Sequence, residues 1–359
     1  MRSTKLLSIV VSLVLGLVLI GCSQQAEPTT APSGGDEGEV AQSESDDGAQ
    51  DAPEELRTVV FIPKATESTF WLALLQGARD AAEELGGYNE VEYQGVADQR
   101  DISGQVSVVE NMVSRQVNGI LLAATDATAL SPAVEQAVEN GIPVITVDSG
   151  VESDAPLAYI ETDNLAAAEV AADTLAELIN EQGVVGDIGI TAGSVTGQQR
   201  EDGFRDRMNE AYPDIEVLEV QYSACDPSTA LDIANDMLTG KPDLNGFYGA
   251  CDGAGVGAGQ AVNQRGLGDQ VRIVSFDVTP EEFQLFLDGY IDALIVQDPW
   301  SMGYEGMMQL HQVINGGEVD TEHKQIPAVV VTQDNLDDPE IQRLLSTYPD
   351  IAEILEGRE

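Results

Sequence analysis

Charged, amide and aromatic side chains recur in this sequence at one kind of place, close to short runs of β-branched and aliphatic residues. Carboxylates and amides bind hydroxyl groups, which both donate and accept hydrogen bonds, and an aromatic plane stacks on the apolar face of a sugar ring. A set of such side chains is therefore suited to a polyhydroxylated ligand. The set includes Lys64, Phe70, Trp71, Asp148, Asp277 and Gln297.

Residue types used in catalysis and metal binding are scarce. The chain has two histidines and three cysteines, and it contains no phosphate-loop, serine-hydrolase or zinc-protease motif. Gly253, Gly255 and Ala258 loosely imitate a dinucleotide fingerprint. That imitation lies mid-chain, and Cys251 and Asp252 crowd the place where a pyrophosphate must approach. We predict that the protein is not an enzyme and holds neither a cofactor nor a metal ion.

The charge balance excludes another class of partner. Among 359 residues there are 63 acidic and 16 basic ones, giving a formal net charge of −47. The first 56 residues hold ten of the acids and two of the bases, so the remainder still has a net charge of −39. Such a surface repels phosphate backbones, and we predict no nucleic-acid partner. Acid surplus with few lysines also resembles proteins from saline habitats.

The N-terminus is typical of an exported lipoprotein. A basic start with Arg2 and Lys5 precedes an apolar run that ends in Leu19-Ile20-Gly21-Cys22. The run is short for a membrane span, which needs ~20 residues. We expect residues 1–21 to be a signal peptide and Cys22 to be lipidated; the alternative is plain secretion. Residues 22–56, which are polar and acidic, are expected to be a disordered tether that holds the protein outside the cytoplasm at the membrane.

The rest of the chain alternates between two hydrophobic periodicities. Strands that alternate with helices imply parallel sheets covered on both faces, and this many pairs favour two α/β lobes over one sheet. In such sheets, ligands bind beyond the carboxyl ends of the strands. Strands are predicted at 58–63, 91–96, 119–123, 143–148, 187–192, 216–222, 246–250, 271–276 and 291–297, and helices at 70–85, 105–116, 131–140, 165–181, 200–211, 229–238, 255–265 and 280–287.

From about Thr58 onward the sequence resembles the type I periplasmic sugar-binding proteins of ABC importers, the ribose-binding group. The resemblance implies two doubly wound parallel-sheet lobes joined by a three-stranded hinge. The implied N-terminal lobe spans 57–161 plus 298–323, and the C-terminal lobe spans 162–297 plus 324–359. The matching phrases are 62–71 (IPKATESTFW), 141–148 (GIPVITVD), 159–164 (YIETDN), 274–277 (VSFD) and 297–303 (QDPWSMG).

The resemblance also assigns ligand contacts position by position. Phe70 and Trp71 match the family's aromatic pair, and Asp148 and Asp277 match its aspartates. Arg200 and Gln297 match its arginine and glutamine. Three family contacts are replaced by Lys64, Cys225 and Cys251, so the scaffold is kept while the ligand contacts change. Ser68 replaces a family asparagine, and we expect it to cap the following helix instead.

Cys225 and Cys251 are the two cysteines that remain if Cys22 is lipidated, and an even pair in an exported domain invites a disulfide. The alternative is two free, buried thiols. Bonding requires the two Cα atoms to come within ~7 Å, which the sequence alone does not establish.

The predicted function is capture of a small sugar or polyol between the lobes and delivery to the permease of an ABC importer, by a monomer attached to the membrane only through its lipid. Two alternatives stay open: a ligand-sensing subunit for a membrane receptor or kinase, and a binder of a non-sugar ligand such as a nucleoside or a furanosyl signalling molecule.

Overall fold

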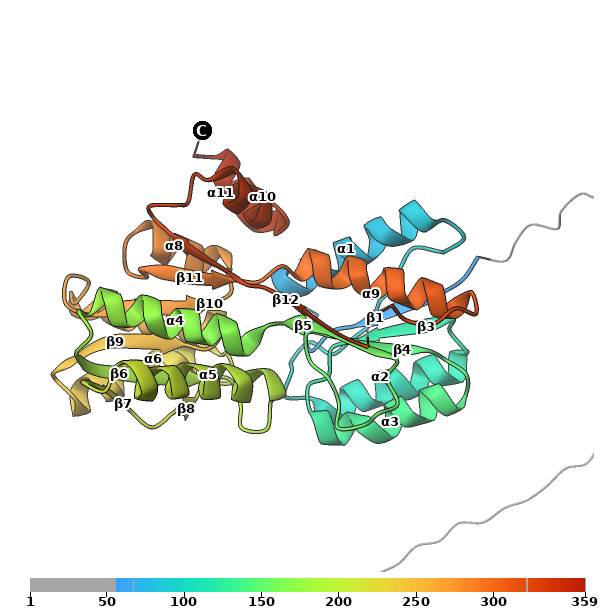
Figure 1. The fold of residues 1–359 in the computed structure, drawn as a ribbon, viewed down its shortest axis with the longest axis horizontal. Helices are drawn as coiled ribbons and strands as arrows, with labels where there is room; N and C mark the ends of the chain where they lie inside the picture. The colour runs from blue at the N-terminus through green and yellow to red at the C-terminus, as the bar shows by residue number, and fades with distance from the viewer. Residues whose placement is uncertain (1–55, 67, 321, 359) are drawn as a thin grey trace, which may run out of the picture. The chain divides into compact units, whose positions relative to one another are not determined.

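The computed structural model describes residues 56–66, 68–320 and 322–358, which form two parallel β-sheets flanked by helices (Figure 1). The predicted signal peptide, lipidated Cys22 and nearly all of the tether lie outside the described residues. Within the described part of the chain, no helix combines the length and apolar character needed to cross a membrane.

The first sheet has the strand order β12-β5-β4-β3-β1-β2, with every pair parallel. Helices α1 and α9 lie on one face, and α2 and α3 lie on the other (Figure 1). The strands are β1 (Val59–Ile62), β2 (Glu92–Tyr93), β3 (Gly119–Leu122), β4 (Val144–Val147), β5 (Ala158–Thr162) and β12 (His323–Ile326), and the helices are α1 (Thr69–Leu85), α2 (Ile102–Arg115), α3 (Ala127–Glu139) and α9 (Pro299–Ile314).

The second sheet has the order β13-β11-β10-β9-β6-β7, with β8 also paired to β6; only the β11–β13 pair is antiparallel. Its strands are β6 (Gly183–Gly189), β7 (Ile215–Val217), β8 (Gln221–Tyr222), β9 (Leu244–Gly249), β10 (Arg272–Phe276), β11 (Ala293–Val296) and β13 (Val329–Thr332). Around it lie α4 (Asn164–Leu178), α5 (Val195–Ala211), α6 (Pro227–Gly240), α7 (Asp252–Arg265), α8 (Pro280–Leu287), α10 (Pro339–Leu345) and α11 (Pro349–Glu356).

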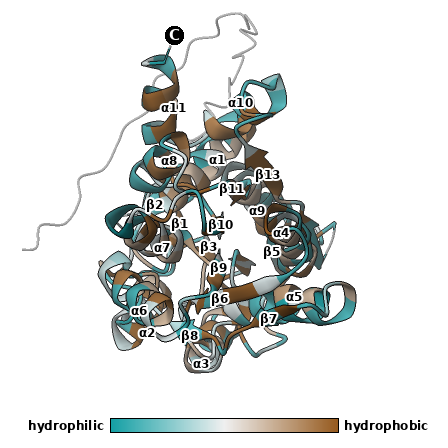
Figure 2. Cartoon of the chain, turned by 90° about the vertical axis from the view of Figure 1, so that its left-hand side faces the viewer, coloured by the Kyte–Doolittle hydropathy of each residue, from teal (hydrophilic) through white to brown (hydrophobic). Residues whose placement is uncertain are grey.

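The strands form because their residues are apolar and mostly β-branched, and most of them are buried on both faces. Figure 2 shows helices such as α5, α10 and α11 carrying both hydrophobic and hydrophilic residues, as expected for helices that cover a sheet with one face. Many helices then begin at a residue whose side chain accepts a hydrogen bond from the backbone N–H three residues later. These caps are Asp101, Asp126, Asp163, Ser194, Asp226, Thr279 and Asp298, so part of the acid surplus serves the helix starts.

The chain passes between the two sheets three times. It leaves the first sheet after β5, returns after β11, and crosses again between β12 and β13. The two-lobed parallel architecture predicted from the sequence is therefore confirmed. The first sheet includes β12 up to Ile326, which is beyond the predicted boundary at residue 323.

Two predicted strands are shorter than expected. The strand predicted at 91–96 is confined to β2, because its partner β1 is followed by Pro63, which has no N–H to continue the ladder. The strand predicted at 216–222 is divided into β7 and β8. At the gap, the Arg205 guanidinium binds the Leu218 carbonyl oxygen and pairs with the buried Asp187 at 3.0 Å.

Candidate functional site

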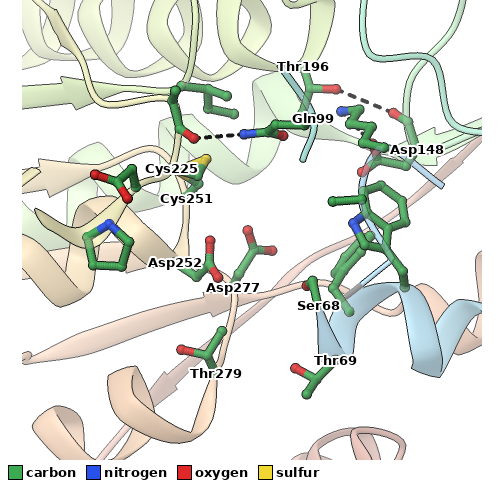
Figure 3. A pocket seen from close by; sticks show the side chains of 18 of the residues that line it. Ser68, Thr69, Gln99, Asp148, Thr196, Cys225, Cys251, Asp252, Asp277 and Thr279 are labelled. Atoms are coloured by element: carbon green, nitrogen blue, oxygen red, sulfur yellow. Dashed lines mark hydrogen bonds and ion pairs between the residues drawn. A yellow bond between two sulfur atoms is a disulfide. The ribbon is translucent and has the colours of Figure 1, made fainter. Parts of the chain in front are cut away.

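A cavity of about 680 Å³ lies where the carboxyl ends of strands from both sheets meet. This volume is within the range of small-molecule sites. Residues from both lobes line it, as Figure 3 shows for Asp148 on one side and Asp277 on the other. The structure brings together here all nine side chains predicted as ligand contacts: Lys64, Phe70, Trp71, Asp148, Arg200, Cys225, Cys251, Asp277 and Gln297.

The first-lobe corner of the cavity is an ion pair between Lys64, just after β1, and Asp148, just after β4. Lys64 Nζ lies 2.8 Å from Asp148 Oδ2, and the two side chains are only 12% and 6% exposed. The Ser149 hydroxyl donates a second hydrogen bond to the same carboxylate oxygen, at 2.9 Å. Asp148 has a positive φ of 63°, which is uncommon for a residue with a side chain. These contacts fix the orientation of the Asp148 carboxylate.

The aromatic wall comes from the first turn of α1. The rings of Phe70 and Trp71 meet edge to face, with centroids 4.8 Å apart, and Trp71 also packs against Phe61 in the first-lobe core. Phe70 in addition packs against the hydrophobic core of the second lobe. Ser68 occupies the N-cap position of α1, but its hydroxyl makes no capping hydrogen bond and lines the cavity instead. Ser68 is thus the N-cap residue of α1, as expected, although its side chain does not bind a backbone N–H of the helix.

The second-lobe floor is organised around the buried Arg200 of α5. Its Nε donates to Asn164 Oδ1 at 2.9 Å, and its Nη1 donates to the Ala250 carbonyl oxygen at 2.8 Å. Nη1 also lies 3.6 Å from Asp277 Oδ2, and the guanidinium lies 4.0 Å above the Phe276 ring centroid. These contacts fix the guanidinium, which in turn orients the Asp277 carboxylate.

Gln297 links this floor to the hinge, because it directly follows β11 at the second crossing. Its Nε2 donates to Asp277 Oδ1, and its Oε1 accepts a hydrogen bond from Thr162 Oγ1 at 2.6 Å. The Tyr348 hydroxyl donates to its backbone carbonyl oxygen at 3.0 Å. Tyr348 immediately precedes α11, so the C-terminal segment also supports the site.

Asp252, at the start of α7, is a cavity residue that the sequence analysis did not assign to the site. Burial, together with the nearby Asp277 carboxylate, raises the pKa of Asp252 to about 7. Burial also raises the pKa of Asp277, although Arg200 and Gln297 oppose that shift. Behind them, burial and the charge of Asp252 raise the pKa of the fully buried Glu282 well above its ordinary value. A carboxyl that is partly protonated near neutral pH both donates and accepts, as a sugar hydroxyl does.

Cys225 and Cys251 are joined by a disulfide with an S–S distance of 2.15 Å and Cα atoms 6.0 Å apart. Their sulfurs and an oxygen of Asp252 lie within 4.8 Å of one another. Disulfide sulfurs are not thiolates, however, so this group is not a metal site. At Gly253, a Cβ atom would lie 1.9 Å from the Cys225 carbonyl oxygen. This glycine of the imitated fingerprint therefore serves chain packing and leaves no room for a pyrophosphate.

Hydrogen bonds also join the lobes directly across the cavity. The Gln99 carboxamide of the first lobe donates to the Ala224 carbonyl oxygen of the second, at 2.8 Å (Figure 3). The hydroxyls of Ser149 and Thr196 lie 2.6 Å apart. Sequence reasoning missed Gln99 and Thr196, because no local pattern shows which residues of two separate lobes will meet.

A family model described as a periplasmic binding protein domain matches residues 59–318. The chain belongs to the periplasmic binding protein family. Within that family it is a type I sugar-binding protein of ABC transporters, as the resemblance implied. The ribose import binding protein RbsB of Escherichia coli (strain K12) is 28% identical over 276 residues, covering 77% of this chain and 91% of RbsB.

Solved structures of periplasmic binding proteins agree with the fold. An ABC transporter solute-binding protein from Agrobacterium vitis with bound D-fucose is 32% identical, with a TM-score of 0.76, covering 80% of this chain and 99% of that one. A carbohydrate transporter solute-binding protein from Agrobacterium radiobacter in complex with D-arabinose is 33% identical, with a TM-score of 0.77. The match covers 80% of this chain and 98% of that one. This family transports sugars and is not enzymatic, as predicted.

Proposed function

We propose that this periplasmic binding protein captures one monosaccharide in the cavity between its lobes and delivers it to the membrane permease of an ABC importer. The cavity supports this proposal most strongly, because it combines an edge-to-face aromatic pair with carboxylates held in place by cations and amides. Related proteins have names or bound ligands that point to ribose, allose, arabinose, fucose and tagatose.

Each wall of the cavity has a proposed task. Phe70 and Trp71 stack on the apolar face of the ring, while Asp148, Arg200, Asp277 and Gln297 bind its hydroxyls. Because the polar groups come from both lobes, a bound sugar bridges the lobes and stabilises the closed state. Cys225 and Cys251 offer only weak hydrogen-bond partners, so that side of the sugar is expected to be less polar.

The test is binding of D-ribose, D-allose, D-arabinose, D-fucose and D-tagatose, first by thermal shift and then by calorimetry. At least one sugar should raise Tm and bind with 1:1 stoichiometry. Asp277→Asn should weaken that binding by tenfold or more, because it removes a charged acceptor. Asp288→Asn, at an exposed position on the same lobe, should not. Failure of all five sugars to bind, or full affinity in Asp277→Asn, would contradict the proposal.

The anchor and the delivery step are part of the same proposal. Lipidation of Cys22 would hold the lobes near the permease, and Cys22→Ala should release the protein from membranes into the soluble fraction. Neighbouring permease and ATPase genes, together with sugar-dependent stimulation of that ATPase by the purified protein, would support transport. A neighbouring receptor or kinase gene without a permease would favour the sensing alternative.

A further inference from the structure

The loop between β8 and α6 approaches the first lobe in an unusual backbone conformation. Ala224 and Cys225 are consecutive non-glycine residues with φ of 55° and 54°, in the left-handed region that side chains disfavour. Such a conformation persists only where surrounding contacts impose it. On one side the Ala224 N–H donates to the Ile190 carbonyl oxygen at 2.7 Å.

On the other side the disulfide joins Cys225 to Cys251, the N-cap residue of α7. The close approach of Gly253 to the Cys225 carbonyl oxygen shows that this loop lies directly on the start of that helix. The disulfide, the packing on Gly253 and the Ala224 N–H bond together hold the loop, and with it the direction in which the Ala224 carbonyl points.

That carbonyl oxygen is the acceptor for Gln99, which belongs to the segment between β2 and α2 of the first lobe. The hydrogen bond crosses the cavity (Figure 3), and all three residues that take part, Gln99, Ala224 and Cys225, line it. Next to it, Arg100 of the first lobe forms an ion pair with Asp98 of the same lobe, and Asp226 of the second lobe is attracted by Arg100 and repelled by Asp98. The Gln99 hydrogen bond is thus a polar contact between the lobes that lies next to the disulfide.

We propose that Gln99 and the Cys225–Cys251 disulfide together form an interlobe latch, in which the disulfide holds the Ala224 carbonyl in place and Gln99 closes onto it. This inference rests on the proposed function, because the latch sets how much of the protein occupies the closed, sugar-binding state. Apparent affinity falls in proportion to the population of that state. Reduction of the disulfide should therefore lower sugar affinity by more than the loss of a weak contact to sulfur would.

The latch predicts a non-additive pattern of affinities. The probe is whichever of the five sugars gives the largest thermal shift, measured by calorimetry on oxidised protein. Gln99→Ala should weaken binding by about three- to tenfold, the size of one net hydrogen bond. Gln99→Glu, which keeps the shape but loses the donor, should weaken it at least as much. Gln76→Ala, which removes an exposed first-lobe glutamine bonded to Asp80, should leave affinity unchanged.

The double variant Cys225→Ser/Cys251→Ser should also weaken binding, and adding Gln99→Ala to it should cost nothing more. Wild-type protein reduced with dithiothreitol, checked by mass for two free thiols, repeats the comparison without a cysteine substitution. Stopped-flow kinetics should place the loss in a faster off-rate, which a purely structural disulfide would not predict. Additive losses, unchanged affinity after reduction, or full affinity in Gln99→Ala would each overturn the latch.

The latch can also be tested without a ligand. Small-angle X-ray scattering of the sugar-free protein should give a larger radius of gyration after reduction and in Gln99→Ala. An unchanged radius in both would overturn the latch even if a sugar binds. If no sugar binds and the radius still increases, the latch stands while the proposed function fails.

Discussion

Replacing Lys64 with Met tests whether the buried Lys64–Asp148 ion pair contributes more to the free energy of unfolding than an exposed ion pair does. The substitution keeps most of the side-chain volume and leaves Asp148, 6% exposed, without its cation. Removing one partner of a buried ion pair costs roughly 3–5 kcal/mol. The hydrogen bond from Ser149 remains and offsets about 1 kcal/mol. We therefore expect the free energy of unfolding to fall by about 2–4 kcal/mol.

Lys241→Met is a matched control, because it changes the net charge equally. Lys241 Nζ pairs with Glu216 Oε1 at 2.6 Å, but these side chains are 38% and 56% exposed. Exposed ion pairs contribute about 0–1 kcal/mol, so the free energy of unfolding of this variant should fall by less than about 1 kcal/mol. Urea unfolding at pH 7, in a buffer of fixed low ionic strength, measures both.

The double variant Lys64→Met/Asp148→Asn removes both charges and should recover part of the stability lost in Lys64→Met, since no buried charge is left unpaired. In calorimetry, Lys64→Met should weaken an anionic sugar acid more than a neutral polyol. Equal stability losses in Lys64→Met and Lys241→Met, or no recovery in the double variant, would refute the reasoning.

Three other predictions concern stacking, pH and salt. Trp71→Ala should weaken sugar binding by about 1–3 kcal/mol in calorimetry through loss of ring stacking, and unchanged affinity in a folded variant would contradict the aromatic wall. A pKa of Asp252 raised to about 7 means that the folded state holds a proton the unfolded state has lost, so stability should fall as pH rises from about 4 to about 7. In Asp252→Asn, stability should depend less on pH over this range, but some dependence should remain. The pKa of Asp187 is also raised to about 7, so that residue contributes in the same direction. Asp98→Asn is the control. Arg100 lowers the pKa of the exposed Asp98 to about 2, so this substitution should leave the pH dependence of stability between about 4 and about 7 unchanged. Finally, Tm should rise between low and molar potassium chloride as salt screens the acidic surface, and a constant Tm would contradict that expectation.

Local patterns in the sequence determined the fold class. Alternating strand and helix periodicity requires parallel strands covered by helices, whatever their order. Because parallel strands all end at the same edge of a sheet, residues just after strands necessarily gather there. This is why Lys64 and Asp148 could be placed at one edge of the first sheet, and Asp277 at the corresponding edge of the second, from their positions at strand ends. That the two edges face each other across one cavity was implied by the resemblance to sugar-binding proteins.

Tertiary structure decided everything that depends on two distant segments meeting. The disulfide requires the Cα atoms of Cys225 and Cys251 to lie close together. The sequence left this open because the periodicity of hydrophobic residues predicts strands but not their order in the sheet. The end of β2 was set by Pro63, which follows its partner strand β1. Ser68 is the N-cap of α1 as predicted, but its side chain lines the cavity and makes no capping hydrogen bond. The contact between Gln99 and the Ala224 carbonyl depends on the relative position of two lobes, which is a property of their packing and of no local run of residues.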